Sequence, residues 1–517
     1  MDGKRFLIAS AILCALVGPV AATPFFVSPT GSDTAAGTSA APWKTLQHAA
    51  DVVGPGDRVT VRAGNYAGFY LDTSGTTAAP IEFDAEPGVL INQPNPVRTQ
   101  HGINLENASH IVIDGFSVTG MQRAGVRSVG VDGDEFASFV TIRNVHSYNN
   151  GYWGILTGFV NDLLIENNVT NGSANEHGIY VSNSGDRPII RNNTSYGNRA
   201  NGIHMNGDGT EGGDGIITGA LVSQNTIYDN GVGGGSGINM DGVQNSRIEN
   251  NLIYNNHASG ISLYQIDGGA GSSGNVVANN TIIEASDARW ALNVQDGSIN
   301  NTIRNNILLN NNPGRGAIDI SPDSLPGFNS DYNAVVSRFT KDDGATFQTL
   351  AQWQAATGND LHSFVSTAAA LFVNPAANDY RLKSGSPGIN VGSNAFAPAS
   401  DIAGLPRPAG GLVDIGAYEY GALAGDFNRD GRVNGSDYIV WRNSVGTNVT
   451  RYSGADGDGS GVIDQADYAR WRSGFGAVAP GAGSSLDALA IPEPTSLSFL
   501  AMTLGLLWVA RRGSGRL

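Results

Sequence analysis

Cysteine is nearly absent from this chain of 517 residues, and its single Cys14 lies close to the N-terminus. Cys14 falls inside an apolar run (residues 6–17) that follows Lys4-Arg5 and precedes the small residues Val20-Ala21-Ala22. This is the pattern of a secretory signal peptide, which we place at residues 1–22. The mature chain then has no cysteine, so it has neither disulfides nor a thiol for nucleophilic or metal-binding chemistry.

Lysine and charge are also scarce. No lysine occurs between Lys44 and Lys341, and charged residues make up 15% of the sequence. The formal net charge of -16 argues against nucleic acid or an anionic membrane surface as a partner, because both bind basic surfaces. Glycine is abundant instead, at 70 residues among recurring Val, Ile and Leu. That composition favours many short strands and tight turns over disorder.

Two short patterns recur through the middle of the chain. Gly-Ile pairs occur at 154–155, 178–179, 202–203, 237–238 and 260–261, and Ile-Glu/Arg-Asn-Asn begins at residues 165, 190, 248 and 303. The usual step is about 23 to 26 residues, which indicates stacked supersecondary units. The units alternate apolar and polar residues and show no helical period. Gly and Asn suit the corners, because both tolerate positive φ and Asn can bond along the stack. The sequence therefore predicts an all-β fold, a right-handed parallel β-helix solenoid.

The strand register assigns side chains to the two faces, because successive side chains of a strand point to opposite sides. The residues expected to point inward are Ile179/Val181, Ile203/Met205, Ile238/Met240 and Ile261/Leu263. The residues expected to point outward are Tyr180/Ser182, His204/Asn206, Asn239/Asp241 and Ser262/Tyr264, with Arg127, Asn293 and Asp319 extending the same stripe. Strands in neighbouring turns lie about 4.8 Å apart, so Tyr180 and His204 should be neighbours on this polar stripe.

The repeat is interrupted beside the stripe. Residues 205–220 form an insertion that carries Asp208, Glu211 and Asp214, and a second Gly-rich insertion covers residues 229–237. Insertions in a solenoid form loops on one face, which is often the binding face. Mixed Tyr, His, Asn, Asp and Ser side chains provide the platforms, donors and acceptors that sugars require. We therefore expect a polysaccharide partner on this face.

Three functions are compatible with the stripe. A lyase or epimerase would use His204 or Tyr180 for proton transfer, with an acidic residue orienting the histidine or holding Ca²⁺. A glycosidase would use two of the carboxylates. A non-catalytic polysaccharide-binding or matrix surface protein would use the tyrosines only as platforms. The predicted catalytic residues are His204, Asp208, Asp241 and Tyr180, and the predicted substrate-binding residues are Tyr264, Asn206, Asn239 and Glu211.

The two ends of the solenoid region carry a family resemblance. Residues 25–66 contain a helical stretch (43–53) expected to cap the solenoid and a strand-like stretch (57–66) expected to form the first turn. This segment resembles the opening of secreted, pectate-lyase-like β-helix proteins, including family-nine polysaccharide lyases, and residues 378–420 resemble the closing segment of bacterial surface β-helix proteins. The resemblance implies action on polysaccharides. The lysine base common in family-nine lyases has no counterpart here, so Arg, His or Tyr would have to serve.

Two acidic loops follow the solenoid, at residues 426–437 and 456–467, each followed by a similar helix-forming stretch. Both match the spacing of a twelve-residue calcium loop, with Gly at the sharp turn. The predicted Ca²⁺ ligands are Asp426, Asn428, Asp430, Asn434 and Asp437 in the first loop and Asp456, Asp458, Ser460, Asp464 and Asp467 in the second. The pair resembles a type I dockerin, which implies calcium-dependent folding and a cohesin-like partner.

The C-terminus begins with Pro492-Glu493-Pro494 and continues as an apolar run to Ala510, followed by Arg511 and Arg512. The run is shorter than the roughly 20 residues of a bilayer span. This order resembles the PEP-CTERM sorting signal of bacterial envelope proteins. The resemblance implies exosortase processing, secretion to the cell surface or extracellular matrix of a bacterium, and membrane contact only through this tail; a weak C-terminal anchor is the alternative.

The sequence thus predicts seven segments. They are a signal peptide (1–22), an N-terminal cap with the first turns (23–100), the parallel β-helix repeats (101–340), the last turns and closing segment (341–421), the dockerin-like paired calcium loops (422–478), a linker (479–490) and the sorting signal (491–517).

Overall fold

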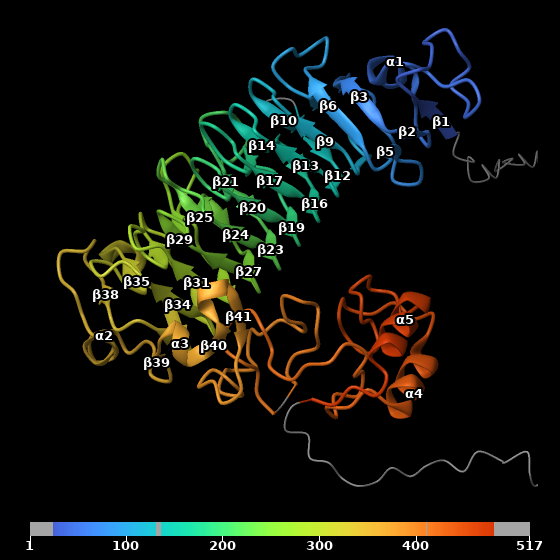
Figure 1. Cartoon of the computed structure of the whole chain (residues 1–517). Coiled ribbons are helices and arrows are strands. Elements are labelled where there is room, and N and C mark those ends of the chain that lie inside the picture. The colour runs from blue at the N-terminus through green and yellow to red at the C-terminus, as the bar shows by residue number, and fades with distance from the viewer. Residues whose placement is uncertain (1–23, 131–135, 410, 480–517) are drawn as a thin grey trace, which may run out of the picture. The chain divides into compact units, whose positions relative to one another are not determined.

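The computed structural model describes residues 24–130, 136–409 and 411–479. These residues contain a right-handed parallel β-helix of about 12 turns, because its three sheets have 12, 11 and 12 strands (Figure 1). The predicted signal peptide, sorting signal and nearly all of the linker lie outside the described residues. The central prediction from the repeat, a parallel β-helix, is confirmed.

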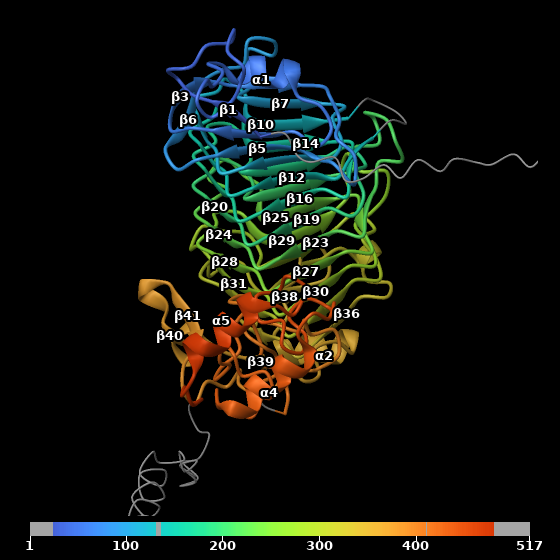
Figure 2. The same ribbon diagram turned by 90° about the vertical axis from the view of Figure 1, so that its right-hand side faces the viewer.

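Each turn contributes one strand to each sheet. Sheet 1, seen face-on in Figure 2, contains β1 (Pro24–Val27), β2 (Arg58–Val61), β5 (Ile81–Ala85), β8 (Ile111–Asp114), β12 (Val140–Arg143), β16 (Leu164–Glu166), β19 (Ile189–Arg191), β23 (Leu221–Ser223), β27 (Arg247–Glu249), β30 (Val276–Ala278), β33 (Thr302–Arg304) and β36 (Asn329–Asp331). Sheet 2 contains β4 (Phe69–Leu71), β7 (Ile103–Glu106), β10 (Ala124–Val129), β14 (Trp153–Gly158), β18 (Ile179–Ser182), β21 (Ile203–Asn206), β25 (Ser236–Asp241), β29 (Ser259–Tyr264), β32 (Leu292–Val294), β35 (Ile318–Ile320) and β38 (Phe339–Thr340). Sheet 3 contains β3 (Gly64–Ala67), β6 (Val89–Gln93), β9 (Ser117–Thr119), β13 (His146–Tyr148), β17 (Val169–Asn171), β20 (Thr194–Tyr196), β24 (Thr226–Tyr228), β28 (Leu252–Tyr254), β31 (Thr281–Glu284), β34 (Ile307–Asn310), β37 (Ala334–Val335) and β39 (Phe364–Val365).

Small elements complete the described chain. Two-stranded sheets form from β11 (Ala137–Ser138) with β15 (Val160–Asn161), β22 (Ile217–Thr218) with β26 (Val243–Gln244), and β40 (Phe372–Asn374) with β41 (Asp379–Leu382). The helices are α1 (Leu46–Val52), α2 (Leu350–Thr357), α3 (Ala368–Leu371), α4 (Gly435–Ser444) and α5 (Gln465–Gly474), with 3₁₀ turns at Pro322–Ser324 and Pro375–Ala377. None of the helices in the described part of the chain has the length and hydropathy to cross a bilayer.

The two asparagines of each Asn-Asn pair have different structural roles at the corner between sheets 1 and 3. The first, such as Asn250 (φ 55°), takes the left-handed conformation that turns the chain. The second is buried and stacks on its equivalents. For example, the Asn225 backbone N–H donates to Asn251 Oδ1 at 3.1 Å, and the Asn251 backbone N–H donates to Asn280 Oδ1 at 3.0 Å. This ladder satisfies buried backbone groups where the sheet hydrogen bonds stop.

A second asparagine ladder runs along the corner between sheets 3 and 2. The backbone N–H of Asn198 donates to Asn230 Oδ1 at 3.0 Å, and that of Asn230 donates to Asn256 Oδ1 at 3.1 Å. In the next turn Glu284 takes the ladder position. Its side chain packs against Gly260 as that of Asn256 packs against Gly237 one turn earlier. Glu284 Oε1 lies 3.0 Å from the ideal Cβ position of Gly260, and Asn256 Nδ2 lies 3.3 Å from that of Gly237. Both carboxyl oxygens of Glu284 are buried without a hydrogen-bond partner.

The N-terminal end is closed by α1, as the sequence predicts. Thr45 caps the helix by accepting the His48 N–H at 3.2 Å, and Leu46, Ala49 and Ala50 are buried beneath it. Residues 24–27 form β1, which pairs in parallel with β2 and adds one strand to sheet 1 ahead of the first full turn. The expectation that residues 57–66 begin the first turn is confirmed, because β2 and β3 lie there and β4 completes the first turn that has a strand in all three sheets.

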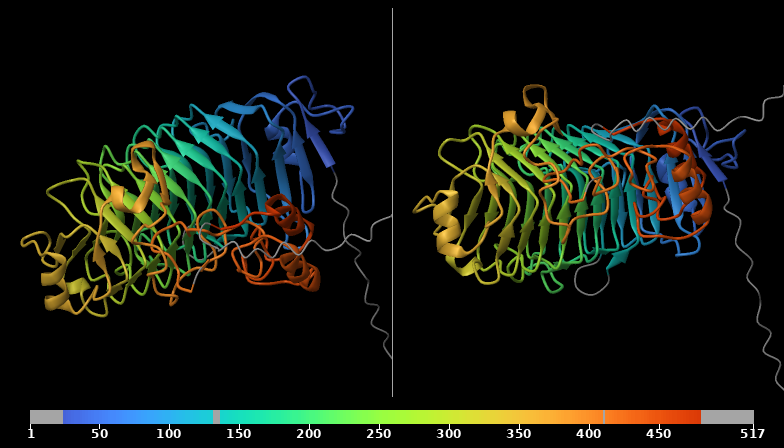
Figure 3. Two further views of the ribbon diagram at one scale, coloured as in Figure 1. Left: turned by 60° about the horizontal axis from the view of Figure 1, so that its bottom comes forward. Right: turned by 90° about the horizontal axis from the view of Figure 1, so that it is seen from below.

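The opposite end is closed by α2, whose Trp353 is fully buried and stacks on Phe339 at 5.2 Å between ring centroids. Beyond it the closing segment (residues 378–420) does not simply cap the solenoid. It runs back beside the corner between sheets 1 and 3 (Figure 3). Four left-handed corner residues hold it with side-chain amides: Gln224 to Asp401 O, Asn250 to Ser400 O, Asn279 to Asp414 O and Asn305 to Ser393 O, at 2.7–2.9 Å.

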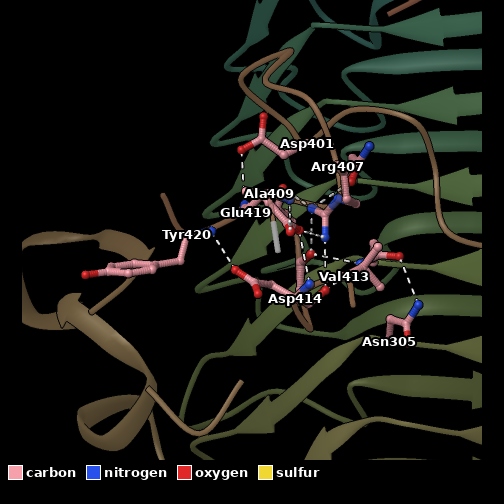
Figure 4. Close-up of polar contacts among 12 residues, drawn as sticks. Asn305, Asp401, Arg407, Ala409, Val413, Asp414, Glu419 and Tyr420 are labelled. Carbon is pink, nitrogen blue, oxygen red and sulfur yellow. Dashed lines mark hydrogen bonds and ion pairs between the residues drawn. The ribbon is translucent and has the colours of Figure 1, made fainter. Parts of the chain in front are cut away.

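The closing segment is pinned by one buried arginine (Figure 4). Arg407 Nη1 lies 3.1 Å from a carboxyl oxygen of Glu419, and both side chains are fully buried. Arg407 also donates to the carbonyl oxygens of Asp414 and Ala417 at 2.9 and 3.0 Å. The Glu419 carboxylate in turn accepts the backbone N–H groups of Ala409 and Asp414, so the ion pair sits inside a network of backbone contacts.

The C-terminal module (residues 422–478) consists of two loop–helix units that resemble each other in structure as well as sequence. Each helix begins with a capping box, Asn434 with Asp437 in α4 and Asp464 with Asp467 in α5. The units also exchange equivalent contacts, because Trp441 Nε1 donates to Asp464 O at 2.7 Å and Trp471 Nε1 donates to Asn434 O at 2.8 Å.

Candidate functional site

The outer face of sheet 2 carries the predicted polar stripe. The pairing register places in one row Asn104, Arg127, Leu156, Tyr180, His204, Asn239, Ser262, Asn293 and Asp319. The inward residues between them, from Ile179 to Leu263, are buried in the core. The expected assignment of faces is therefore confirmed for this sheet. Tyr180 and His204 are neighbours and stack at 4.9 Å between ring centroids.

A pair of histidines lies at the centre of this face. His177 Nδ1 accepts the backbone N–H of Asn201 at 3.3 Å, and its Nε2 lies 3.0 Å from His204 Nδ1. His177 therefore carries its proton on Nε2 and donates it to His204, which leaves the His204 proton on Nε2. That Nε2 is buried and has no hydrogen-bond partner.

Burial decides the protonation of the central groups. It lowers the pKa of His204 to about 3 and holds the pKa of His177 well below its usual value. It raises the pKa of the Tyr180 hydroxyl to about 12. At neutral pH both imidazoles are neutral and Tyr180 keeps its proton. A histidine held this way is a weak base, and its unpaired Nε2–H is better suited to donate a hydrogen bond.

The predicted acidic residues mainly hold loops. Asp241 is buried and accepts the backbone N–H groups of Ile266, Asp267 and Gly268 at 2.8–2.9 Å. Asp208 (φ 40°) accepts the backbone N–H and the hydroxyl of Thr210. These contacts satisfy both carboxylates within their own loops. Neither carboxylate forms a hydrogen bond with a ring nitrogen of His204.

The predicted substrate-binding residues are distributed along the same face. Asn206 donates to the Tyr180 hydroxyl oxygen at 3.2 Å, and Asn239 donates to the Tyr264 hydroxyl oxygen at 2.9 Å. These contacts leave both hydroxyl hydrogens available to a ligand. Asn239 and Tyr264 line one cleft, and Glu211 lines another.

The first cleft, cleft 1, is basic. It has a volume of 540 Å³ and is lined by Arg98, Arg123, Arg127, His101 and Glu106 among others. Glu106 pairs with Arg98 at 2.7 Å and with Arg127 at 2.9 Å. The Arg123 guanidinium lies 5.1 Å from the ring centroid of Trp153. Three arginines against the two carboxylates of Glu106 and Glu211 give this cleft a small net positive charge on an acidic protein.

His101, which lies in cleft 1, makes the same kind of backbone contact as His177. It precedes a Gly-Ile pair, and its Nδ1 accepts the Ala124 backbone N–H at 3.3 Å. Burial and the neighbouring arginines lower its pKa to about 4, so it is a neutral donor in cleft 1. Both histidines precede a Gly-Ile pair, and this shared His-Gly-Ile sequence could have identified His101 as a site residue.

The second cleft, cleft 2, has the same volume of 540 Å³ and lies five strands further along sheet 2. Its lining combines aromatic, acidic and basic side chains: Tyr264, Trp290, Asp296, Asp319, Arg289 and Arg315. The sequence placed Arg127 and Asp319 on the stripe without giving them a role. Arg98, Arg123, Arg289 and Trp290 were missed, because they lie outside the two interleaved repeat series.

The acidic loops of the C-terminal module bring carboxylates together. One oxygen from each of Asp456, Asp458 and Asp467 lies within 4.8 Å of the others. Burial raises the pKa values of Asp456 and Asp467. Asp467 accepts backbone N–H groups from Gly457 and Asp464, and Asp437 does the same for Asn428 and Asn434 in the first loop. The carboxylate oxygens gathered in the second loop are the kind of ligand that Ca²⁺ prefers.

Comparisons with known proteins agree with this fold. Residues 25–209 match the family model described as Pel9A-like, right handed beta helix region, and residues 173–324 match one described as right handed beta helix region. Pectate lyase PEL9 of Emericella nidulans is 38% identical over 80 residues, which are 15% of this chain and 20% of that protein. The chain thus spans about a fifth of the length of the curated relative that it matches.

Solved structures give a wider match at lower identity. The structure of pectate lyase Pel9A superposes with a TM-score of 0.55 over 78% of this chain and 97% of that chain, at 16% identity. An alginate lyase from Paenibacillus sp. str. FPU-7 has a TM-score of 0.43 over 53% of this chain and 94% of that chain, at 19% identity. Together with the three-sheet topology, the two family models and the Pel9A structure show that the solenoid has the fold of a pectate-lyase-like right-handed parallel β-helix.

Proposed function

We propose that this chain is a secreted, carbohydrate-active protein that binds an acidic polysaccharide on the outer face of sheet 2 and cleaves or modifies it, as a lyase, an epimerase or a glycosidase. The observation that carries the proposal is the clustering of Arg98, Arg123 and Arg127 in one open cleft of a chain with net charge -16. Guanidinium groups bind carboxylates with strong, directional hydrogen bonds. The pectate lyase matches support the same class of substrate.

The central residues suit proton transfer and positioning in such a reaction. Tyr180 keeps its proton, and the Nε2 of His204 is buried without a hydrogen-bond partner. We propose that His204 and Tyr180 donate hydrogen bonds that position the sugar, while Tyr264, Asn206, Asn239 and Glu211 contact its hydroxyl groups. Asp208 and Asp241 would act by holding the loops that border the site.

The experiment that tests this function uses the mature chain with polygalacturonate, alginate, a glycosaminoglycan and a neutral glucan. Ultraviolet absorbance of unsaturated ends and total reducing ends are followed together. Unsaturated ends on a uronate polymer would establish a lyase, and reducing ends without absorbance would establish a hydrolase. Epimerisation is read from the proton NMR spectrum of the recovered polymer. Binding without any of these changes would favour a non-catalytic surface protein, and no binding to any polymer would refute the proposal.

Cleft 1 makes a specific prediction. Substituting Arg123→Gln should weaken binding of polygalacturonate about tenfold to a hundredfold, because one charge-assisted hydrogen bond contributes about 1.5–3 kcal/mol. Affinity electrophoresis or calorimetry measures the change. Arg58→Gln is the matched control, since Arg58 is exposed on sheet 1 and pairs with Asp84. An equal loss in both variants would show that overall charge, and not cleft 1, governs binding.

We also propose that the C-terminal module binds Ca²⁺ in both loops through Asp426, Asn428, Asp430, Asn434 and Asp437, and through Asp456, Asp458, Ser460, Asp464 and Asp467. Support comes from the converging carboxylates of the second loop. Free Ca²⁺ at about 100 times its dissociation constant should stabilise the module by about 2.7 kcal/mol for each bound ion. Thermal unfolding with Ca²⁺ or chelator, and elemental analysis of bound metal, test this.

Asp458→Ala should remove one of two bound Ca²⁺ ions, whereas the exposed control Asp287→Asn should leave both. Retention of two ions by the Asp458→Ala protein would contradict the proposed second site. The remaining assignments from the sequence are proposed on the motifs alone: a cohesin-like partner for the module, exosortase processing of the tail, and display on the bacterial surface or in its matrix.

A further inference from the structure

Asp319 is the buried carboxyl group at the floor of cleft 2. It lies at the centre of β35, between the fully buried Ile318 and Ile320. Its side chain points outward and follows Asn293 in the row along sheet 2. The residue is 7% exposed, and its Oδ1 is buried without a hydrogen-bond partner. An acidic group that lines a cleft and is largely shielded from water is placed to exchange a proton with a ligand.

The groups around Asp319 are of both signs. Burial raises its pKa to about 6, and the nearby carboxylates of Asp343 and Asp342 act in the same direction. Arg315 and a hydrogen bond from Gln295 oppose the shift. Asp296 lies on the lining of the same cleft, and its pKa is raised mainly by burial. The result is one protected carboxyl group beside the more exposed carboxylates of Asp343 and Asp296.

The rest of cleft 2 fits a sugar. The ring of Trp290 forms part of its lining and lies 6.1 Å from that of Phe347. The Tyr264 hydroxyl oxygen accepts from Asn239, so its hydrogen is free to face the cleft. Arg289 and Arg315 are exposed and can meet a carboxylate of an acidic sugar. Trp290 is only 3% exposed, so Tyr264, the polar side chains and the two arginines form the site for an acidic sugar unit.

We propose that Asp319 is the proton donor to the leaving glycosidic oxygen of an acidic polysaccharide bound in cleft 2. This inference rests on the proposed function and extends it by naming the acid. As the glycosidic C–O bond breaks, its electron pair stays on the oxygen, which takes the proton of the Asp319 carboxyl group. Asp319 is left as a carboxylate and regains a proton from solvent. In elimination a base removes the adjacent ring proton and a C=C bond forms; in hydrolysis water adds to the anomeric carbon.

The test compares wild type, Asp319→Asn and the control Asp229→Asn on the polymers used above. Asp229 is an exposed corner residue after β24, where Asn stands in the corresponding corners of other turns. Asp319→Asn should lower kcat about 100-fold or more with little change in KM, as expected for loss of a general acid. It should also remove the fall in wild-type activity that deprotonation of Asp319 causes as the pH rises through 6. Thermal unfolding shows whether both variants fold.

The outcomes separate this inference from the proposed function. Cleavage by wild type with full activity in a folded Asp319→Asn protein would overturn the role of Asp319 and leave the proposed function standing. Loss of polymer binding together with loss of activity would assign Asp319 to substrate binding and overturn its role as the acid. Absence of cleavage by wild type on every polymer would overturn both the catalytic function and this inference.

Discussion

The Arg407→Leu protein is expected to lose about 3–5 kcal/mol of its free energy of unfolding, the range observed when one partner of a buried ion pair is removed. The substitution leaves Glu419 without its cation in a fully buried position (Figure 4). It also removes the donors to the carbonyl oxygens of Asp414, Gly416 and Ala417. Burial already raises the pKa of Glu419 to about 7 against the opposing effect of Arg407, so loss of the guanidinium favours the protonated acid still further.

Chemical denaturation followed by circular dichroism measures this loss, and Arg381→Leu is the control. Arg381 also pairs with an acid, Asp379 at 2.6 Å, but its side chain is 66% exposed, and exposed pairs contribute about 0–1 kcal/mol. The double variant Arg407→Leu/Glu419→Gln should recover part of the loss, because it no longer buries an unpaired charge. Equal effects at Arg407 and Arg381 would show that the ion pair does not hold the closing segment.

The Glu284→Gln protein is expected to be more stable than wild type at pH 7, by about 1–3 kcal/mol. Both carboxyl oxygens of Glu284 are buried and unpaired, and burial raises its pKa well above 4.5. The folded state therefore holds the proton more tightly than the unfolded state. As the pH rises above 4.5, the unfolded chain releases its proton first, so stability falls by up to about 1.4 kcal/mol per pH unit until the folded-state pKa is reached.

An amide has no such titration, and glutamine at this position can continue the ladder of Asn198, Asn230 and Asn256. The stabilities of wild type and Glu284→Gln should converge below pH 4.5 and separate as the pH rises, which denaturation curves at several pH values would show. The exposed Glu86 provides the control substitution Glu86→Gln. A difference between wild type and Glu284→Gln that does not change with pH would mean that Glu284 is not titrating in the core.

The solenoid could be predicted from the sequence because every turn places the same requirements on its residues. Every turn needs apolar inward residues, as at Ile203 and Met205, and an Asn-Asn pair at the same corner, as at Asn250 and Asn251. Each requirement is local and recurs at a nearly fixed step, so even an imperfect repeat indicates the register. The face of Tyr180 and His204 followed directly, because strand alternation fixes which side chains point outward.

The chemistry of the site was harder to predict because it depends on burial and long-range neighbours. Outward geometry predicted His204 as an exposed base, whereas His177 and Tyr180 cover it and burial keeps it neutral. Asp241 looked available, but the loop after β29 folds over its carboxylate. Cleft 1 gathers Arg98 and Arg123 from connections whose paths the repeat does not specify.

A solenoid transmits stability mainly between adjacent turns, so its ends can open while its middle stays folded. The returning closing segment changes that behaviour here, because it joins the turns of Gln224, Asn250, Asn279 and Asn305 through one continuous stretch of chain. Those turns cannot separate from each other without releasing a segment that is more than 80 positions away in sequence. They therefore form one cooperative unit. Cleft 2 lies largely on these tethered turns and cleft 1 on the turns before them, so the two clefts belong to parts of the solenoid with different capacities for local opening.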